Sequence, residues 1–185
     1  MVVPRSWKHA DAMSAMREFL GQAPPRRAAV RDLMKELVSD NPYSARCAAD
    51  LARLVSAREP GILRRYADVL IDLAGALPME QWQARGYVTL AAALNAWTPA
   101  QRMRLLVLVR AMAEDERNAL RAIALEAFGT LAAAEPELRE EAMVLMERAR
   151  RTGTGAMKSR ARRMLLVLLA AERSRRALSR GRNGI

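Results

Sequence analysis

Apolar residues recur at helical spacing in three similar segments of the chain, and each segment follows a proline. The prolines, Pro60, Pro99 and Pro136, lie 39 and 37 residues apart. The positions six, nine, ten and thirteen residues after each proline are apolar in all three segments, and they are Tyr66, Val69, Leu70, Leu73, Leu105, Leu108, Val109, Met112, Ala142, Leu145, Met146 and Ala149. This spacing marks one face of a helix, and proline is favoured at the first helical position. The pattern therefore predicts three helices that each bury one face.

A second predicted helix in each unit is marked by an arginine. The four arginines, separated by 39, 36 and 39 residues, are Arg46, Arg85, Arg121 and Arg160. Around the first three, the positions one before, three after and six after are apolar and mostly small, and they are Ala45, Ala49, Ala52, Ala84, Val88, Ala91, Leu120, Ala124 and Ala127. Small residues let neighbouring helix axes approach, and Gly86 and Gly129 in the same helices serve this end despite their low helix propensity. Three residues after the fourth arginine, Arg163 occupies the position that is Ala49 in the first unit, as expected for an atypical terminal repeat.

Helical spacing also extends toward the start of the chain. Residues 9–38 hold two more apolar groups, separated by Gly21 and the pair Pro24–Pro25, and the groups are Met13, Met16 and Leu20, then Val30, Leu33, Met34 and Leu37. Helix pairs that repeat at a fixed period bury their apolar faces against their neighbours. We therefore expect a single helical-repeat domain over residues 1–185. Its expected parts are a degenerate N-terminal pair over 9–39, core repeats over 40–154, a capping helix over 155–170 and a basic C-terminal tail over 171–185.

In two units an aspartate precedes the marked arginine by six residues, whereas Met79 takes that place in another unit. The Asp–Arg repeat positions are Asp40, Arg46, Arg85, Asp115 and Arg121. With these positions and its proline-started helices, the chain resembles the HEAT repeats of armadillo-type proteins over residues 40–170, and small bacterial HEAT-repeat proteins of unassigned function. The resemblance implies an all-α fold, a right-handed α-α superhelix (solenoid) of about four HEAT-like helix pairs. It also implies a concave binding surface lined by the arginine-marked helices.

The net charge of +11 is concentrated at the end of the chain. Residues 148–185 contain 12 Lys and Arg residues and one acid, Glu172, so the preceding part is neutral as a whole. Such a basic segment is an electrostatic footprint for polyanions, and Arg binds phosphates with two hydrogen bonds. The candidate polyanion-binding residues are Arg150, Arg151, Lys158, Arg160, Arg162, Arg163, Arg173, Arg175 and Arg176. A solvated terminal helix with a frayed tail is the alternative interpretation, and a membrane-surface helix around 164–171 is one that we do not favour.

Residues suited to catalysis or metal binding are scarce. His9 is the only histidine and Cys47, expected to be a small buried residue, is the only cysteine. Hydrolase triads need a base, and metal sites need several His, Cys or clustered acids. The acids at 114–116 are interpreted as helix caps, and Gly153 and Gly155 as part of a turn between helices. We therefore expect a protein that is not an enzyme and has no cofactor or metal. Without a signal peptide or a membrane-spanning apolar run, the expected location is cytoplasmic.

Two aromatic residues lie on an arginine-marked helix and are the candidate partner-binding residues. Trp82 and Tyr87 belong to residue types enriched at binding hot spots, although burial in the core is the alternative interpretation. The sequence predicts a non-catalytic binding or scaffold protein that holds a protein or peptide partner on the concave surface of a HEAT-repeat solenoid. Nucleic-acid (DNA) binding through the Arg-rich C-terminal end is the alternative. The partner's identity and the oligomeric state are left open.

Overall fold

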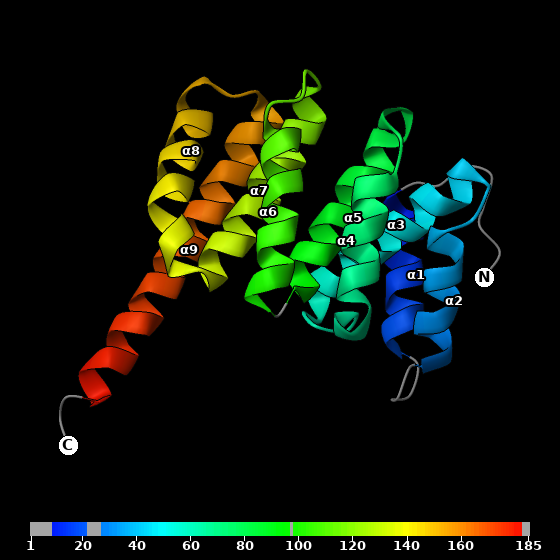
Figure 1. Cartoon of the computed structure of the whole chain (residues 1–185), viewed down its shortest axis with the longest axis horizontal. Helices are drawn as coiled ribbons and strands as arrows, with labels where there is room; N and C mark the ends of the chain where they lie inside the picture. The colour runs from blue at the N-terminus through cyan, green and yellow to red at the C-terminus, as the bar shows by residue number, and fades with distance from the viewer. Residues whose placement is uncertain (1–8, 22–26, 97, 183–185) are drawn as a thin grey trace. The chain divides into compact units, whose positions relative to one another are not determined.

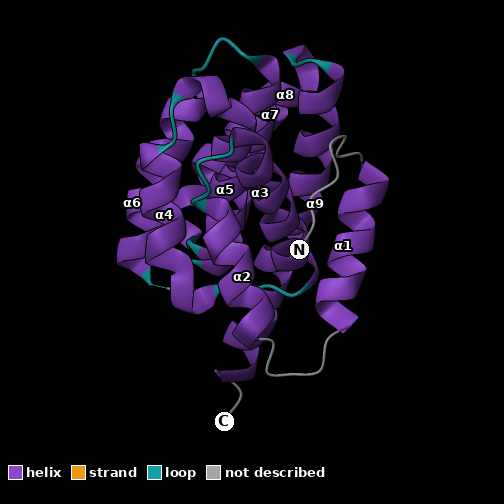
Figure 2. Cartoon of the chain, turned by 90° about the vertical axis from the view of Figure 1, so that its right-hand side faces the viewer, coloured by secondary structure: helices purple, strands orange, loops and turns teal. Residues whose placement is uncertain are grey.

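The computed structural model describes residues 9–21, 27–96 and 98–182, with the side chains of residues 9, 10, 12 and 176–182 outside that description. The described residues form nine α-helices and three short 3₁₀ helices, and they contain no strand (Figure 1, Figure 2). The all-α fold class is therefore confirmed. The helices divide between two compact units, Met1–Leu108 and Val109–Ile185. The single domain expected over residues 1–185 stays a prediction.

In the first unit, α3 (Pro42–Arg58) is the central helix. Three helices pack against α3, namely α1 (His9–Gly21), α2 (Arg27–Leu37) and α5 (Trp82–Asn95), and α4 (Ala67–Ala76) packs against α5. The two helices expected within residues 9–39 are thus present as α1 and α2. The small residues predicted to be buried on the arginine-marked helices α3 and α5 are all buried; they are Ala45, Ala49, Ala52, Ala84, Val88 and Ala91.

Short 3₁₀ helices and side-chain caps introduce the helices of the first unit. The segments η1 (Arg64–Tyr66) and η2 (Met79–Gln81) lead into α4 and α5. Asn41 caps α3, because its Oδ1 accepts hydrogen bonds from the backbone N–H groups of Tyr43 and Ser44 at 3.0 and 3.4 Å. At the start of α6 (Pro99–Ala113), Thr98 and Gln101 exchange two hydrogen bonds of 3.2 Å between side chain and backbone, which is a capping box.

Asn95, the last residue of α5, connects three segments of the first unit. Its side chain is fully buried, and its Nδ2 donates hydrogen bonds to Ser56 Oγ at 2.8 Å and to the Ala91 carbonyl oxygen at 2.7 Å. Its Oδ1 accepts a hydrogen bond of 2.8 Å from the backbone N–H of Leu63. Because Ser56 belongs to α3 and Leu63 to the turn before α4, this one amide joins α5 to both.

The second unit contains the end of α6, from Val109, and the helices that follow it. They are α7 (Asn118–Ala134), α8 (Arg139–Thr152), preceded by η3 (Pro136–Leu138), and α9 (Gly155–Arg182). All three α-helices pack against one another, most extensively α7 against α9. A Cβ added at Gly129 of α7 would lie only 2.9 Å from Cβ and Cγ of Met164 of α9. Glycine at this position therefore allows the two helices to approach closely.

The expected capping helix over 155–170 is longer in the structure. It begins at Gly155 but continues for 28 residues to Arg182, through most of the segment expected as a tail, and Figure 1 shows its end extending past α8. The physical reason is that residues 171–180 are mostly strong helix formers without proline or glycine. In addition, Arg139 at the start of α8 forms an ion pair of 2.7 Å with Glu172, which holds this part of α9.

The three prolines introduce their helices in different ways. Pro99 is the first residue of α6, and Pro136 begins the 3₁₀ helix before α8. Pro60 instead lies in a turn whose next residue, Gly61, has a φ of 87°, and α4 begins only at Ala67. The column ten residues after each proline is buried throughout, but Val69, nine residues after Pro60, is 46% exposed. The prediction that every column is buried was therefore wrong at Val69, because the turn shifts the start of α4.

Candidate functional site

A groove of about 270 Å³ lies where α3 and α5 begin. It is lined by the first turn of α3 and by the segment that enters α5, and the residues are Pro42, Tyr43, Arg46, Glu80, Gln81, Trp82, Gln83 and Ala84. The groove occurs there because the two arginine-marked helices pack side by side and both start at this end of the first unit. Two aromatic rings and one guanidinium group thus border the same space.

The side chains of this groove are held in place by contacts with one another. Arg46 Nη1 donates a hydrogen bond of 3.1 Å to Gln83 Oε1, which links α3 to α5. The Arg46 guanidinium also lies 5.2 Å from the centroid of the Tyr43 ring, within the range of a cation–π contact. Trp82 is the first residue of α5 and is half-buried. Such an arrangement presents apolar area beside a positioned cation.

The structure separates the two candidate partner-binding residues. Trp82 lines the groove, whereas Tyr87 is half-buried on α5 with the Arg53 guanidinium 5.0 Å from its ring centroid. Arg53 is itself paired with Asp50 on α3. Tyr87 therefore contributes to the packing of α3 on α5, and Tyr43, which the sequence analysis did not single out, takes its place beside Trp82. The hydrophobic pattern gave no signal for Tyr43, since it precedes the small-residue columns of α3.

The Asp–Arg repeat positions have partners other than each other. Asp115 Oδ1 accepts a hydrogen bond of 2.8 Å from the backbone N–H of Arg117, just before α7, and forms an ion pair of 3.3 Å with the Arg117 side chain. Arg117 is the N-cap residue of α7, and no side chain caps this helix through a hydrogen bond, so Asp115 holds the turn before α7 instead of forming the expected helix cap. Arg121 donates to Met157 Sδ at 3.8 Å, and Arg85 donates to Met79 Sδ at 3.0 Å. Asp40 is exposed, and Arg46 bonds to Gln83.

The basic end contains arginines of two kinds. Four of the candidate polyanion-binding residues form ion pairs with acids, and the pairs are Arg150 with Glu147 at 2.9 Å, Arg160 with Glu126 at 3.2 Å, Arg163 with Glu126 at 2.5 Å, and Arg175 with Glu172 at 3.2 Å. Glu126 belongs to α7, so two arginines of α9 meet an acid that lies 34 and 37 residues earlier in the chain. These pairs compensate part of the charge that the sequence concentrates at this end.

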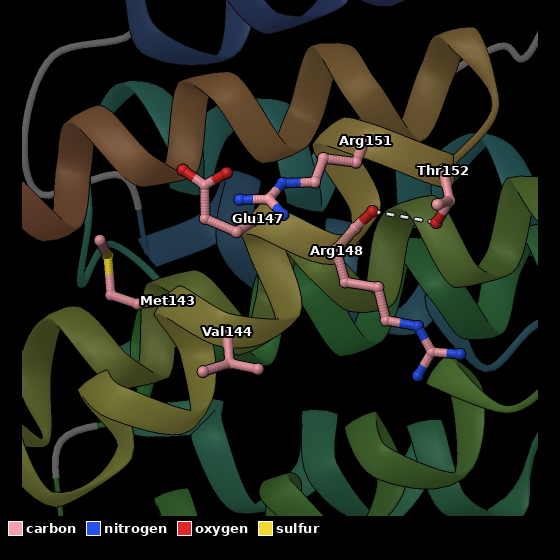
Figure 3. A pocket seen from close by; sticks show the side chains of 6 residues that line it. All are labelled: Met143, Val144, Glu147, Arg148, Arg151 and Thr152. Carbon is pink, nitrogen blue, oxygen red and sulfur yellow. Dashed lines mark hydrogen bonds between the residues drawn. The ribbon is translucent and has the colours of Figure 1, made fainter.

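The other candidate residues of the basic end have no ion pair within the described part of the chain. They are Arg151, Arg162 and Arg173, which are exposed, and Lys158, which is half-buried. The side chain of Arg176 lies outside the described residues. Figure 3 shows Arg151 on α8 among the residues of a surface pocket of about 470 Å³, with Met143, Val144, Glu147, Arg148 and Thr152. There the guanidinium of Arg148 points away from that of Arg151.

A smaller pocket of about 210 Å³ lies at one end of the second unit. The end of α6, the start of α7, the end of α8 and the start of α9 meet there, and the lining residues are Ala113, Glu114, Arg121, Leu125, Leu145, Arg148, Ala149, Thr152, Gly153 and Met157. Gly153 lies in the turn between α8 and α9, as expected, and α9 begins at Gly155. Two guanidinium groups, those of Arg121 and Arg148, border this space.

The cysteine, the histidine and the acidic residues were the other candidates for catalysis or metal binding. Cys47 is fully buried, and burial raises the pKa of its thiol, although the nearby Tyr43 side chain lowers it in part. The side chain of His9 lies outside the described residues. Across residues 9–21, 27–96 and 98–182, no group of three or more His, Cys, Asp or Glu side chains is placed to hold a metal ion. Within the same ranges, none of the helices combines the length and the apolar character needed to cross a bilayer.

Comparison of the chain with known proteins found no matching family model, no matching curated protein and no matching solved structure.

Proposed function

We propose that this chain is a non-catalytic binding protein, built from HEAT-like helix pairs, that holds a peptide segment of a protein partner at the groove where α3 and α5 begin. The proposal includes the arrangement that the resemblance implies, a right-handed solenoid of about four helix pairs. One observation carries the proposed function. Tyr43 and Trp82 border the same groove, and Arg46 is fixed beside them by its hydrogen bond of 3.1 Å to Gln83.

The chemistry of the groove suits a peptide better than a free metabolite. Its volume of about 270 Å³ lies below the usual range for sites that enclose a whole small molecule, but it accommodates one or two side chains. Tyr and Trp supply a large contact area with few rotatable bonds, and Arg is the third residue type enriched at hot spots. We therefore expect an apolar or aromatic anchor residue with an acidic neighbour, which would pair with Arg46.

Selection of displayed random peptides on the full chain tests this proposal. The enriched peptides are synthesised, and their dissociation constants are measured by fluorescence anisotropy on the wild type, Trp82→Ala and Met103→Ala. Met103 is 58% exposed on α6 and outside the groove, so it controls for the loss of an exposed apolar side chain. We expect Trp82→Ala to weaken binding by at least about tenfold, the effect of a hot-spot residue, and Met103→Ala to leave it unchanged.

The proposal fails if no peptide is enriched above the background of a carrier protein. It also fails if the enriched peptides bind Trp82→Ala as tightly as the wild type. Two variants of Arg46 test the acidic neighbour. Arg46→Lys keeps the charge but loses the planar guanidinium that bonds to Gln83, whereas Arg46→Gln removes the charge. Selected peptides that contain an acidic residue beside the anchor should lose more affinity with Arg46→Gln than with Arg46→Lys.

Nucleic-acid binding is the second candidate function. It is supported by Arg151, Arg162 and Arg173, which are exposed and, among the described residues, have no ion pair. Each phosphate contact of a cation adds to the dependence of affinity on salt concentration. The matched variants are Arg151→Gln with Arg162→Gln, and Arg150→Gln with Arg175→Gln, since both pairs remove the same charge.

The two double variants should differ if duplex DNA is the partner. Removing the unpaired arginines should lower the slope of log affinity against log salt by about 2, whereas removing the paired ones should change it by less than about 1. Arginines that already face an acid contribute less to the attraction of phosphate. Equal slopes for the wild type and both variants would exclude DNA binding through these residues.

A further inference from the structure

The pocket at the end of the second unit brings together two arginines that are separated in the sequence. Arg121 lies in the first turn of α7 and Arg148 lies shortly before the last turn of α8, and both line the same space of about 210 Å³. Neither arginine has an ion pair within the described part of the chain. The repeat pattern of the sequence marks Arg121, but it does not predict that this residue lies beside Arg148.

Arg121 is the less exposed of the two. It is half-buried, and among the described residues its guanidinium has a single hydrogen-bond partner, Met157 Sδ, at 3.8 Å. A thioether is a weak acceptor, whereas a guanidinium carries five N–H donors. A partly desolvated cation with so few acceptors favours an added anion more than an exposed cation does. Arg148 is exposed, so its side chain remains available to a ligand in the pocket.

The remaining polar groups of the pocket define what the ligand can be. Thr152 Oγ1 already donates to the Arg148 carbonyl oxygen at 3.0 Å, and the Gly153 N–H to the Ala149 carbonyl oxygen at 2.9 Å. The donors left for a ligand are therefore the two guanidinium groups, which approach from different helices. An anion with oxygens on several faces can accept hydrogen bonds from both guanidinium groups, whereas a carboxylate presents its oxygens in one plane. The small volume admits one such group and not a large molecule.

We propose that this pocket binds phosphate, either as the free inorganic anion or as the terminal group of a small phosphate monoester, between Arg121 and Arg148. Glu114, an exposed residue, also lines the pocket and carries the opposite charge to the two arginines. Its negative charge opposes phosphate binding, so removing this charge should strengthen binding, whereas removing either arginine should weaken it. The site is independent of the peptide groove, which lies in the other unit.

The test is calorimetric titration of the full chain with inorganic phosphate and, separately, with phenyl phosphate, at constant ionic strength set with sodium chloride. The variants are Arg148→Gln, Arg151→Gln, Arg121→Gln and Glu114→Gln. Arg151 is the matched control, since it is also exposed on α8, three residues further on, but lies outside the pocket. Circular dichroism spectra confirm that each variant is folded before titration.

We expect saturable phosphate binding that Arg148→Gln and Arg121→Gln each weaken by about tenfold or more, the loss of one charge-assisted pair of hydrogen bonds. Arg151→Gln should weaken it by less than about twofold, and Glu114→Gln should strengthen it. Comparable affinity for phenyl phosphate would identify a monoester as an accepted ligand, and binding of inorganic phosphate alone would identify the free anion. If Arg121→Gln does not fold, Arg148→Gln decides the result.

Two results would overturn the inference. One is the absence of saturable binding of either phosphate compound to the wild type. The other is an equal loss of affinity with Arg148→Gln and Arg151→Gln, which would mean that phosphate responds only to the net charge of α8. Binding of duplex DNA, by contrast, would be weakened by Arg151→Gln and not by Arg148→Gln, so the two proposals for the second unit remain distinguishable.

Discussion

Replacing Asn95 by alanine should destabilise the first unit through the loss of one buried amide. Asn95 is fully buried, and its three hydrogen bonds of 2.7 to 2.8 Å join α5 to Ser56 of α3 and to the backbone N–H of Leu63. Ser56 Oγ, which is fully buried, would lose the donor from which it accepts. The Leu63 N–H, which belongs to a buried turn, would lose its acceptor and be left without a partner.

The magnitude follows from these contacts. A buried donor without a partner costs about 1–3 kcal/mol, and the space left by the missing amide adds about 1 kcal/mol in lost packing. We therefore expect Asn95→Ala to lower the free energy of unfolding by about 3 kcal/mol, which is a large part of the stability of a typical domain. Ser56→Ala should cost less, and the two changes should not be additive, since they remove the same hydrogen bond.

Urea denaturation followed by far-ultraviolet circular dichroism measures the effect, with the free energy extrapolated linearly to water. The matched control is Asn118→Ala, because Asn118 is exposed at the start of α7 and should change the stability by less than about 0.5 kcal/mol. If Asn95→Ala and Asn118→Ala reduced stability equally, the buried amide would not be the connection that its contacts indicate. Additive losses for Ser56→Ala and Asn95→Ala would contradict the shared hydrogen bond.

Two further predictions concern tight packing. Gly129→Ala should lower the free energy of unfolding by about 1–3 kcal/mol, because the new methyl group would lie 2.9 Å from Met164. Gly155→Ala should be neutral, because a methyl group there would have no atom within 4 Å. Urea denaturation of both variants measures the difference, and equal stability of the two would refute the prediction. Cys47 should react with an aromatic disulfide reagent far more slowly in the native protein than in urea, because it is buried and its thiol pKa is raised above the ordinary 9.0. The raised pKa also means that the contribution of the Cys47 thiol to the free energy of unfolding is fully present below pH 9.0. This contribution declines as the pH rises past 9.0, since the thiol of the unfolded chain then loses its proton first.

The helices could be predicted from the sequence because their signals are local. All nine apolar residues at the repeated positions around Arg46, Arg85 and Arg121 are buried, although these positions belong to two separate units. Each of these positions repeats at a spacing that only one helix face can satisfy. The prediction was wrong at Val69, because Pro60 begins a turn and not a helix, and turn chemistry outweighed the repeat spacing there.

The candidate sites could not be predicted to the same degree, because they join residues that no periodicity connects. The groove combines Tyr43 of α3 with Trp82 of α5, and the sequence identified only the second. The phosphate pocket combines Arg121 with Arg148, and of these the sequence noted one as a repeat marker and the other only as the start of the basic segment. Their meeting depends on how α7 and α8 pack, which a single sequence does not reveal.

The charge of the basic end shows why counting along the sequence overstates a polyanion surface. Residues before 148 are neutral as a whole, yet Glu126 and Glu147 among them neutralise Arg160, Arg163 and Arg150 once the helices pack. An arginine that already shares an acid gains less from a phosphate than an unpaired one, because it must give up part of an existing interaction. The proposed binding of anions therefore depends mainly on the unpaired cations. Of these, Arg148 lines the enclosed pocket, whereas Arg162 and Arg173 lie exposed along α9, where only an extended ligand could reach both. A small anion and a nucleic acid would thus use different subsets of one basic segment, and substitutions confined to one subset should abolish one activity and preserve the other.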